Sequence, residues 1–151
     1  RSEFIGRLSS GALIFDDYAH HPTEIKSTLA AFRDRFPKSK IVCIFQPHTY
    51  SRTKSLFEQF IRSFNNADIV VITNIYASLR EKIDTAISSK DLVDRIRKFK
   101  EEVFFMPSST DVVEYIDKMN FGSDTIVITI GAGDIYKINE KLILRQAQEK
   151  K

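Results

Sequence analysis

The stretch that decides the fold is Asp16-Asp17-Tyr18-Ala19-His20-His21-Pro22. It begins where the apolar run 12–15 stops and ends where a helical pattern starts. This position is typical of a turn that joins a strand to a helix. Residues such as Asn, Gly or Ser would suffice for such a turn, yet this one carries two carboxylates, a phenol and two imidazoles. We therefore treat it as a candidate site.

Three uses of these polar side chains remain open. The first is a metal site, because the carboxylates of Asp16 and Asp17 and the imidazoles of His20 and His21 are ligand types that suit zinc or manganese. Their spacing matches no recognised metal motif, and neighbouring residues at a strand end point to opposite sides. The second use is capping of the following helix. The third, which we favour, is binding of a ligand.

The chain around this turn alternates between strands and helices. The runs 4–8 and 12–15, joined by the turn signal Ser9-Ser10-Gly11, predict an antiparallel hairpin with its first strand at the sheet edge. Four further apolar runs predict buried parallel strands: 40–46, 68–73, 103–106 and 125–130. Helical periodicity lies between them. We expect an α/β fold, a Rossmann-like doubly wound sheet of five parallel strands plus one antiparallel N-terminal edge strand.

The helical patterns predict which side chains are buried. After Thr53 we expect one helix whose apolar face is formed by Leu56, Phe57, Phe60, Ile61 and Phe64. The pair Ser88 and Asp91 resembles a capping box for a helix with a buried face formed by Leu92, Val93, Ile96 and Phe99. The helix capped near Ser108 is expected to carry Val112, Val113, Ile116 and Met119 on one face. The last helix is expected to begin near Ile135 and to bury Ile138, Leu142 and Leu144.

Unusual residues also follow the later strands. In Gln46-Pro47-His48-Thr49-Tyr50-Ser51-Arg52-Thr53, the His48 imidazole and Arg52 guanidinium could bind a carboxylate or phosphate at a helix start. The alternative is that Arg52 pairs with an acidic neighbour at the surface. Gly131-Ala132-Gly133-Asp134 resembles half of a dinucleotide motif, and indicates close backbone approach to a packing neighbour or a ligand. The connection 74–88 exceeds the usual loop of about two to six residues, which favours a functional segment.

Composition narrows the class of protein. The 151 residues fit a single domain, 1–151, and the net charge of +3 is scattered along predicted helices, which does not favour nucleic acid. No run approaches the roughly 20 apolar residues of a membrane span, and the start lacks a signal-peptide core. The single Cys43 lies in a predicted strand. These features predict a cytoplasmic protein without a membrane partner, and the missing initial Met suggests a fragment of something longer.

The glycine positions argue against an independent nucleotide hydrolase. With glycine only at positions 6, 11, 122, 131 and 133, neither a P-loop nor a complete G-x-G-x-x-G can be placed on the chain. No Ser lies in a nucleophile elbow, and the one Cys is in a strand, so covalent catalysis has no candidate residue.

Three motifs together resemble the C-terminal domain of the Mur ligase family: residues 16–25, residues 45–53 and Gly131-Ala132-Gly133-Asp134-Ile135. The resemblance spans nearly the whole chain. It implies a three-domain, ATP-dependent ligase whose central domain, absent here, carries the P-loop and binds most of the Mg²⁺. The second motif favours the members that join L-alanine to UDP-N-acetylmuramate in peptidoglycan synthesis. The alternatives are another Mur-type ligase, such as the one that recycles murein tripeptide, or a non-catalytic binding module.

The resemblance also implies residue roles. Three residues would lie near the nucleotide and the junction with the other domains: Asp17, Tyr18 and His20. Four would lie on the substrate side, with Arg52 at the carboxylate of L-alanine: His48, Arg52, Gly131 and Gly133. No metal ligand and no certain catalytic residue is expected in this domain, which should be inactive alone. The family usually has Arg where this chain has Thr49, so a second cation would have to come from elsewhere, such as Arg80 or Lys82.

Overall fold

The computed structural model describes residues 2–149, and within them six strands form one sheet. The strands are β1 (Glu3–Arg7), β2 (Leu13–Asp17), β3 (Lys40–Phe45), β4 (Ile69–Ile72), β5 (Val103–Phe105) and β6 (Thr125–Ile130). Their order across the sheet is β1-β2-β6-β3-β4-β5; β1 pairs antiparallel to β2, and all other pairs are parallel. This confirms the predicted sheet. The last strand, β6, is inserted between β2 and β3, which puts the ends of these three strands side by side.

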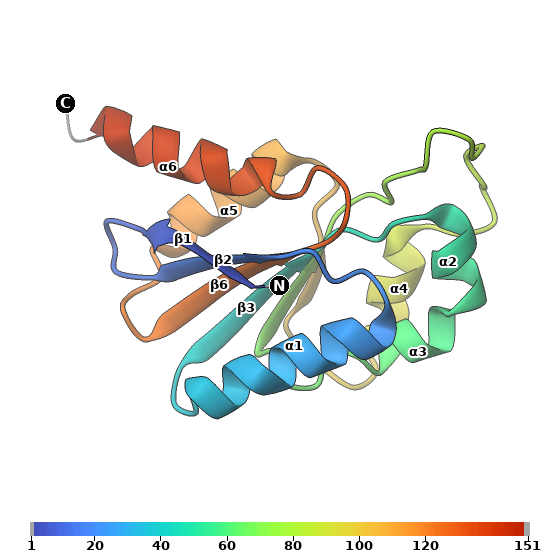
Figure 1. The fold of residues 1–151 in the computed structure, drawn as a ribbon, viewed down its shortest axis with the longest axis horizontal. Coiled ribbons are helices and arrows are strands. Elements are labelled where there is room, and N and C mark those ends of the chain that lie inside the picture. The colour runs from blue at the N-terminus through green and yellow to red at the C-terminus, as the bar shows by residue number, and fades with distance from the viewer. Residues whose placement is uncertain (1, 150–151) are drawn as a thin grey trace.

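Helices cover both faces of the sheet (Figure 1). They are α1 (Pro22–Arg35), α2 (Tyr50–Ser55), α3 (Phe57–Ile61), α4 (Ser89–Ile96), α5 (Ser109–Met119) and α6 (Lys137–Glu149). The side chains of α1, α3 and α4 pack with one set of strand residues, and those of α5 and α6 pack with the alternate set. In β3, for example, Cys43 joins the first core and Val42 the second. Among the described helices, none has the length and hydropathy needed to cross a bilayer.

The hairpin turn requires a glycine at position 11. Gly11 has φ +110°, a conformation that L side chains rarely adopt, and its N–H donates to the Leu8 carbonyl. A Cβ atom added here would lie 2.8 Å from the backbone nitrogen of Ser123, in the turn before β6. The turn signal at this position therefore reflects both a local conformation and a close tertiary contact.

Several helical expectations are wrong at the helix ends. The single helix expected after Thr53 begins earlier, at Tyr50, and is split at Leu56, where the backbone has φ −112° and ψ 23°. Phe99 is 75% exposed because α4 ends at Ile96 and the helical periodicity no longer applies beyond it. Met119, the last residue of α5, is also exposed.

The last helix begins two residues later than expected, at Lys137, and Leu144 on its outer side is exposed. Ile138 and Leu142 are buried as predicted. These differences share a cause: periodicity identifies the inner face of a helix, but its end residues are covered only if another element reaches them.

Candidate functional site

The first turn separates its two carboxylates. Asp17 is buried, and its Oδ1 accepts a hydrogen bond from the Ala19 N–H at 2.8 Å on the α1 side of the sheet. Asp16 faces the other side, where the Thr129 hydroxyl donates to it at 2.6 Å. Burial raises the pKa of Asp16, despite the opposing effect of that hydroxyl. Within residues 2–149, no group of three His, Cys, Asp or Glu side chains could hold a metal ion.

Capping of α1 accounts for His21. Its Nδ1 accepts the Thr23 N–H at 3.2 Å, while the Glu24 carboxylate accepts the backbone N–H groups of His20 and His21 at 3.2 and 3.0 Å. This is a capping box, with His21 in the position that Ser or Thr usually takes. The capping interpretation is therefore confirmed for His21, and it leaves Asp17, Tyr18 and His20 as the ligand candidates.

Tyr18 and Asp17 border a shallow recess of about 470 Å³ next to the start of α1. The Tyr18 side chain is 63% exposed, and its ring lies edge-on to the His20 imidazole, with 5.8 Å between ring centroids. The hydroxyl residues Thr23, Ser27 and Thr28 also line the recess. An exposed aromatic ring can stack on a flat group, and the polar side chains beside it can form hydrogen bonds with sugar hydroxyls.

The second turn uses its helix-start donors internally. Both oxygens of Glu81, from the 74–88 connection, accept N–H groups at the start of α2: Tyr50 to Oε1 and Ser51 to Oε2, each at 2.9 Å. The Thr49 hydroxyl accepts the Arg52 N–H at 3.2 Å. An anion therefore cannot use these three N–H groups without displacing Glu81 or Thr49. Recognition of an anion at this turn falls to side chains.

Arg52 and His48 are the side chains available for that task. Arg52 donates to the backbone carbonyl of His48, which closes the turn. Among the described residues no carboxylate forms an ion pair with Arg52, so the alternative of a surface ion pair is not supported. The cationic candidates Arg80 and Lys82 flank Glu81 in sequence and are exposed.

The environment of His48 links the first and second turns. Burial lowers the pKa of His48, the neighbouring Arg52 and His20 lower it further, and the Glu81 carboxylate acts in the opposite direction. The imidazole is therefore neutral at pH 7. Its Nδ1 is buried and has no hydrogen-bond partner within the described part of the chain. Because β2, β6 and β3 are parallel neighbours, the turns that follow β2 and β3 lie at the same edge of the sheet, and this edge carries His20, His48 and Arg52.

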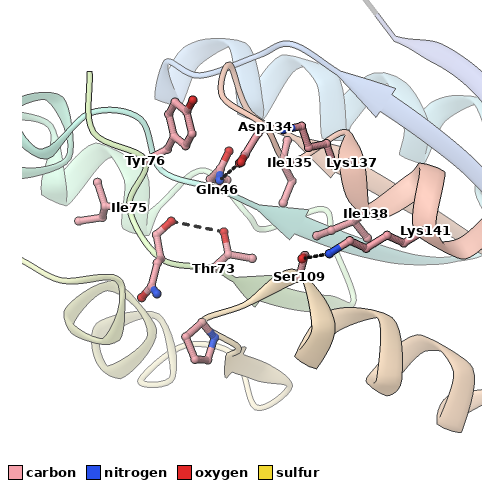
Figure 2. Close-up of a pocket in the computed structure, with 12 residues that line it drawn as sticks. Gln46, Thr73, Ile75, Tyr76, Ser109, Asp134, Ile135, Lys137, Ile138 and Lys141 are labelled. Atoms are coloured by element: carbon pink, nitrogen blue, oxygen red, sulfur yellow. Dashed lines mark hydrogen bonds between the residues drawn. The ribbon is translucent and has the colours of Figure 1, made fainter. Parts of the chain in front are cut away.

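A separate cavity of about 360 Å³ lies beyond the ends of β3 and β4, between the starts of α5 and α6. Figure 2 shows Gln46 donating to Asp134, a bond of 2.8 Å, and Lys141 reaching Ser109. None of the seven predicted site residues lines this cavity. The sequence reasoning missed its polar lining, although Lys137 and Lys141, one helical turn apart, offered a signal.

The two late glycines pack against this region of the protein itself. A Cβ atom at Gly133 would lie 2.6 Å from Gln46 Oε1 and 2.7 Å from the Tyr76 ring. At Gly131 it would lie 3.1 Å from the Gln46 carbonyl and from an Ile135 methyl group. Of the two alternatives left open by the sequence, a packing neighbour accounts for both glycines, and these contacts do not require a ligand.

The comparisons with known proteins agree on one family. The model of the Mur ligase, glutamate ligase domain, matches residues 1–133. The UDP-N-acetylmuramate–L-alanine ligase of Caldanaerobacter subterraneus subsp. tengcongensis is 49% identical over 133 residues, covering 88% of this chain and 28% of that protein. The chain spans less than a third of the length of the curated L-alanine ligases that it matches.

Solved structures share the fold. The UDP-N-acetylmuramate-alanine ligase of Thermotoga maritima superposes with a TM-score of 0.72 at 28% identity, over 94% of this chain and 28% of that one. A crystallised domain from Haemophilus ducreyi superposes with a TM-score of 0.69, over 97% of this chain and 99% of that one. At 20% identity, the second likeness concerns the fold alone. On the family match over residues 1–133, this chain belongs to the family of the Mur ligase glutamate ligase domain.

Proposed function

We propose that this chain is the C-terminal domain of a longer, three-domain ligase. That enzyme would join L-alanine to UDP-N-acetylmuramate at the expense of ATP, in peptidoglycan synthesis in the bacterial cytoplasm. The observation that carries the proposal is that the turn with His20 and the turn with His48 and Arg52 lie at the same edge of the sheet, in a chain 49% identical over 133 residues to an L-alanine ligase. There the His48 imidazole lies near the Tyr76 ring, with 5.5 Å between ring centroids, and the Arg52 guanidinium donates to the His48 carbonyl.

The first turn suits the base and ribose of ATP better than its phosphates. The exposed Tyr18 ring can stack on a base, and the hydroxyls of Thr23, Ser27 and Thr28 can form hydrogen bonds with ribose hydroxyls. The buried Asp17 carboxylate borders the same recess and accepts hydrogen bonds from Ala19 and Thr28. The carboxylates of Asp17 and Glu24 in the same recess would repel a triphosphate. Because no P-loop can be placed on residues 1–151, we assign the phosphates and Mg²⁺ to the central domain.

The second turn suits the carboxylate of L-alanine. A guanidinium binds a carboxylate with two parallel hydrogen bonds, and a neutral imidazole can donate a further one without adding charge. When bound, ATP supplies the phosphoryl group that makes the muramoyl carboxylate reactive toward an amine. The role of Arg52 and His48 is to hold L-alanine by its carboxylate, so that its amine is free to attack. This is catalysis by positioning.

The test is Arg52→Ala in the complete gene product. Loss of a buried charge partner costs roughly 2 to 5 kcal/mol, so the KM for L-alanine should rise by more than tenfold while the KM for ATP changes little. Arg62→Ala, at an exposed position after α3, is the matched control. An unaltered dependence on L-alanine would overturn the assignment of Arg52. A panel of L-alanine, dipeptides and murein tripeptide would show whether another Mur-type activity is the correct one.

A further inference from the structure

The connection 74–88 is fastened to the second turn at several points. Figure 1 shows it passing beside α2. The Tyr76 N–H donates to the Pro47 carbonyl at 2.8 Å, and the Tyr76 and His48 rings are 5.5 Å apart between centroids. Farther along, Asp84 pairs with Lys54 of α2 at 3.4 Å. The connection therefore runs as a strap along the turn that carries His48 and Arg52.

Glu81 makes the most direct of these attachments. Its two carboxylate oxygens accept the backbone N–H groups of Tyr50 and Ser51, which are 31 and 30 positions away in sequence. Burial alone would raise the pKa of Glu81, but these N–H groups, first that of Ser51 and then that of Tyr50, lower it. The carboxylate is therefore charged at neutral pH. Hydrogen bonds to an ionised acceptor are among the stronger ones in proteins.

The geometry of the candidate amino-acid site depends on this carboxylate. Arg52 directly follows the two residues that Glu81 holds, and its guanidinium bonds back to the His48 carbonyl. The hydroxyl of Thr49, the residue after His48, accepts a hydrogen bond from the Arg52 N–H and lies 2.9 Å from the Ser51 hydroxyl. The start of α2 thus acts as one unit, and its direction sets where His48 and Arg52 point. Because Glu81 already accepts the backbone N–H groups at the start of α2, an anion must be bound by the side chains of His48 and Arg52.

We propose that Glu81 is a positioning residue for amino-acid binding: it clamps the start of α2 and so directs His48 and Arg52 toward the substrate carboxylate. This inference rests on the proposed function. Glu81 itself contacts backbone and not substrate, so its loss should weaken L-alanine binding more than ATP binding. Its loss should also lower the pKa of His48 further, because the negative charge that opposes the shift is gone.

The experiment compares Glu81→Gln with Asp84→Asn in the complete gene product. Gln keeps the shape but offers one oxygen for two N–H groups, so the KM for L-alanine should rise about tenfold, the ratio for losing one hydrogen bond to a charged group. The KM for ATP should stay within about twofold of wild type. Asp84 lies on the same connection and binds the same helix, but through the Lys54 side chain. Its variant should leave both constants unchanged.

A second readout separates positioning from general support of the fold. In the 151-residue chain, Glu81→Gln should speed amide exchange at Tyr50 and Ser51 and lower the His48 pKa measured by NMR. If Glu81→Gln fails to fold, Tyr50→Pro removes one of the two donors and leaves Glu81 intact. Pro is tolerated at the first helical position, and the preceding Thr49 already has an extended backbone. Tyr50→Ala, which keeps the N–H, is its control.

The outcomes are distinct. A rise in the KM for L-alanine with Glu81→Gln, or with Tyr50→Pro relative to Tyr50→Ala, supports the proposal when ATP binding is unchanged. The proposal is overturned if Glu81→Gln raises the KM for L-alanine and the KM for ATP equally. It is also overturned if Glu81→Gln changes neither constant while Arg52→Ala raises the KM for L-alanine. In both cases the proposed function still stands. If Arg52→Ala itself has no effect, the proposed site fails. The amide exchange at Tyr50 and Ser51 then still decides whether Glu81 holds the helix start.

Discussion

At the junction between α1, β3 and β4, removal of the Asp68 carboxylate tests how much its hydrogen bonds contribute to the free energy of unfolding. Asp68 Oδ2 accepts the Ile41 N–H at the start of β3 and the Arg33 guanidinium from the last turn of α1, both at 2.8 Å. Arg33 also donates to the carbonyls of Ser39 and Asn66. One carboxylate thus ties a helix end to a strand start, at the end of the sheet opposite the candidate site.

The expected loss in Asp68→Ala is about 2 kcal/mol. A hydrogen bond to a charged group contributes about 1.5 to 3 kcal/mol, and a partly exposed ion pair less than about 1 kcal/mol. Because the Asp68 side chain is 45% exposed and that of Arg33 27%, we take the lower part of the combined range. For a chain of this length, the melting temperature should fall by about 4 to 8 °C. Asp68→Asn, which keeps one acceptor for Ile41, should lose about half as much.

The effect should depend on pH in a defined direction. Burial alone would raise the pKa of Asp68, but the Ile41 N–H and the Arg33 guanidinium outweigh it and hold the pKa below the usual value. A carboxyl with a lowered folded-state pKa stabilises the protein fully above its unfolded-state value, about 3.9. This contribution is lost as the pH falls through the folded-state value. The difference in the free energy of unfolding between wild type and Asp68→Ala should therefore become smaller below about pH 4.

Urea unfolding followed by far-UV circular dichroism at pH 7 and pH 3 measures both effects. The matched control is Asp94→Ala, which removes an exposed pairing with Lys90 at 3.0 Å within α4 and should lose less than about 0.5 kcal/mol. If Asp68→Ala is no more destabilising than Asp94→Ala at pH 7, the assigned hydrogen-bond energies are refuted. If wild type and Asp68→Ala differ in unfolding free energy by the same amount at both pH values, the conclusion that folding lowers the pKa of Asp68 is refuted.

Two further predictions concern the glycines and the isolated chain. Gly11→Ala should destabilise the fold by about 1 to 3 kcal/mol, because its φ of +110° strains an L residue and its Cβ would lie too close to the Ser123 backbone. Gly122→Ala should change the stability little, because the nearest atom to its Cβ, Asp124 Oδ1, would be 3.5 Å away. Equal urea midpoints for the two variants would contradict this prediction. The 151-residue chain alone should bind ATP more weakly than about 1 mM and release no phosphate, because it lacks a P-loop. Magnesium-dependent turnover that Asp17→Ala abolishes would show that the chain carries a complete site.

Local signals in the sequence were sufficient for most of the elements. The apolar runs identified all six strands of the described chain, and the expected capping box of Ser88 and Asp91 is present. The cap expected near Ser108 is also present, and Asp111 makes it a second capping box. These features depend on residues within one turn of a helix or one pleat of a strand. The candidate residues of the first two turns could be selected for the same reason, because the carboxyl ends of parallel strands meet at one edge.

What the sequence by itself determined is the alternation of strands and helices, and with it the sheet edge where polar side chains collect. The tertiary structure decided the contacts between distant segments: the place of β6 between β2 and β3, the neighbours of Gly133, and the attachment of Glu81 to the start of α2. It also left Phe99 exposed beyond the end of its helix. Periodicity and capping report interactions between near neighbours in the chain, whereas these contacts depend on how packed layers bring separate segments together.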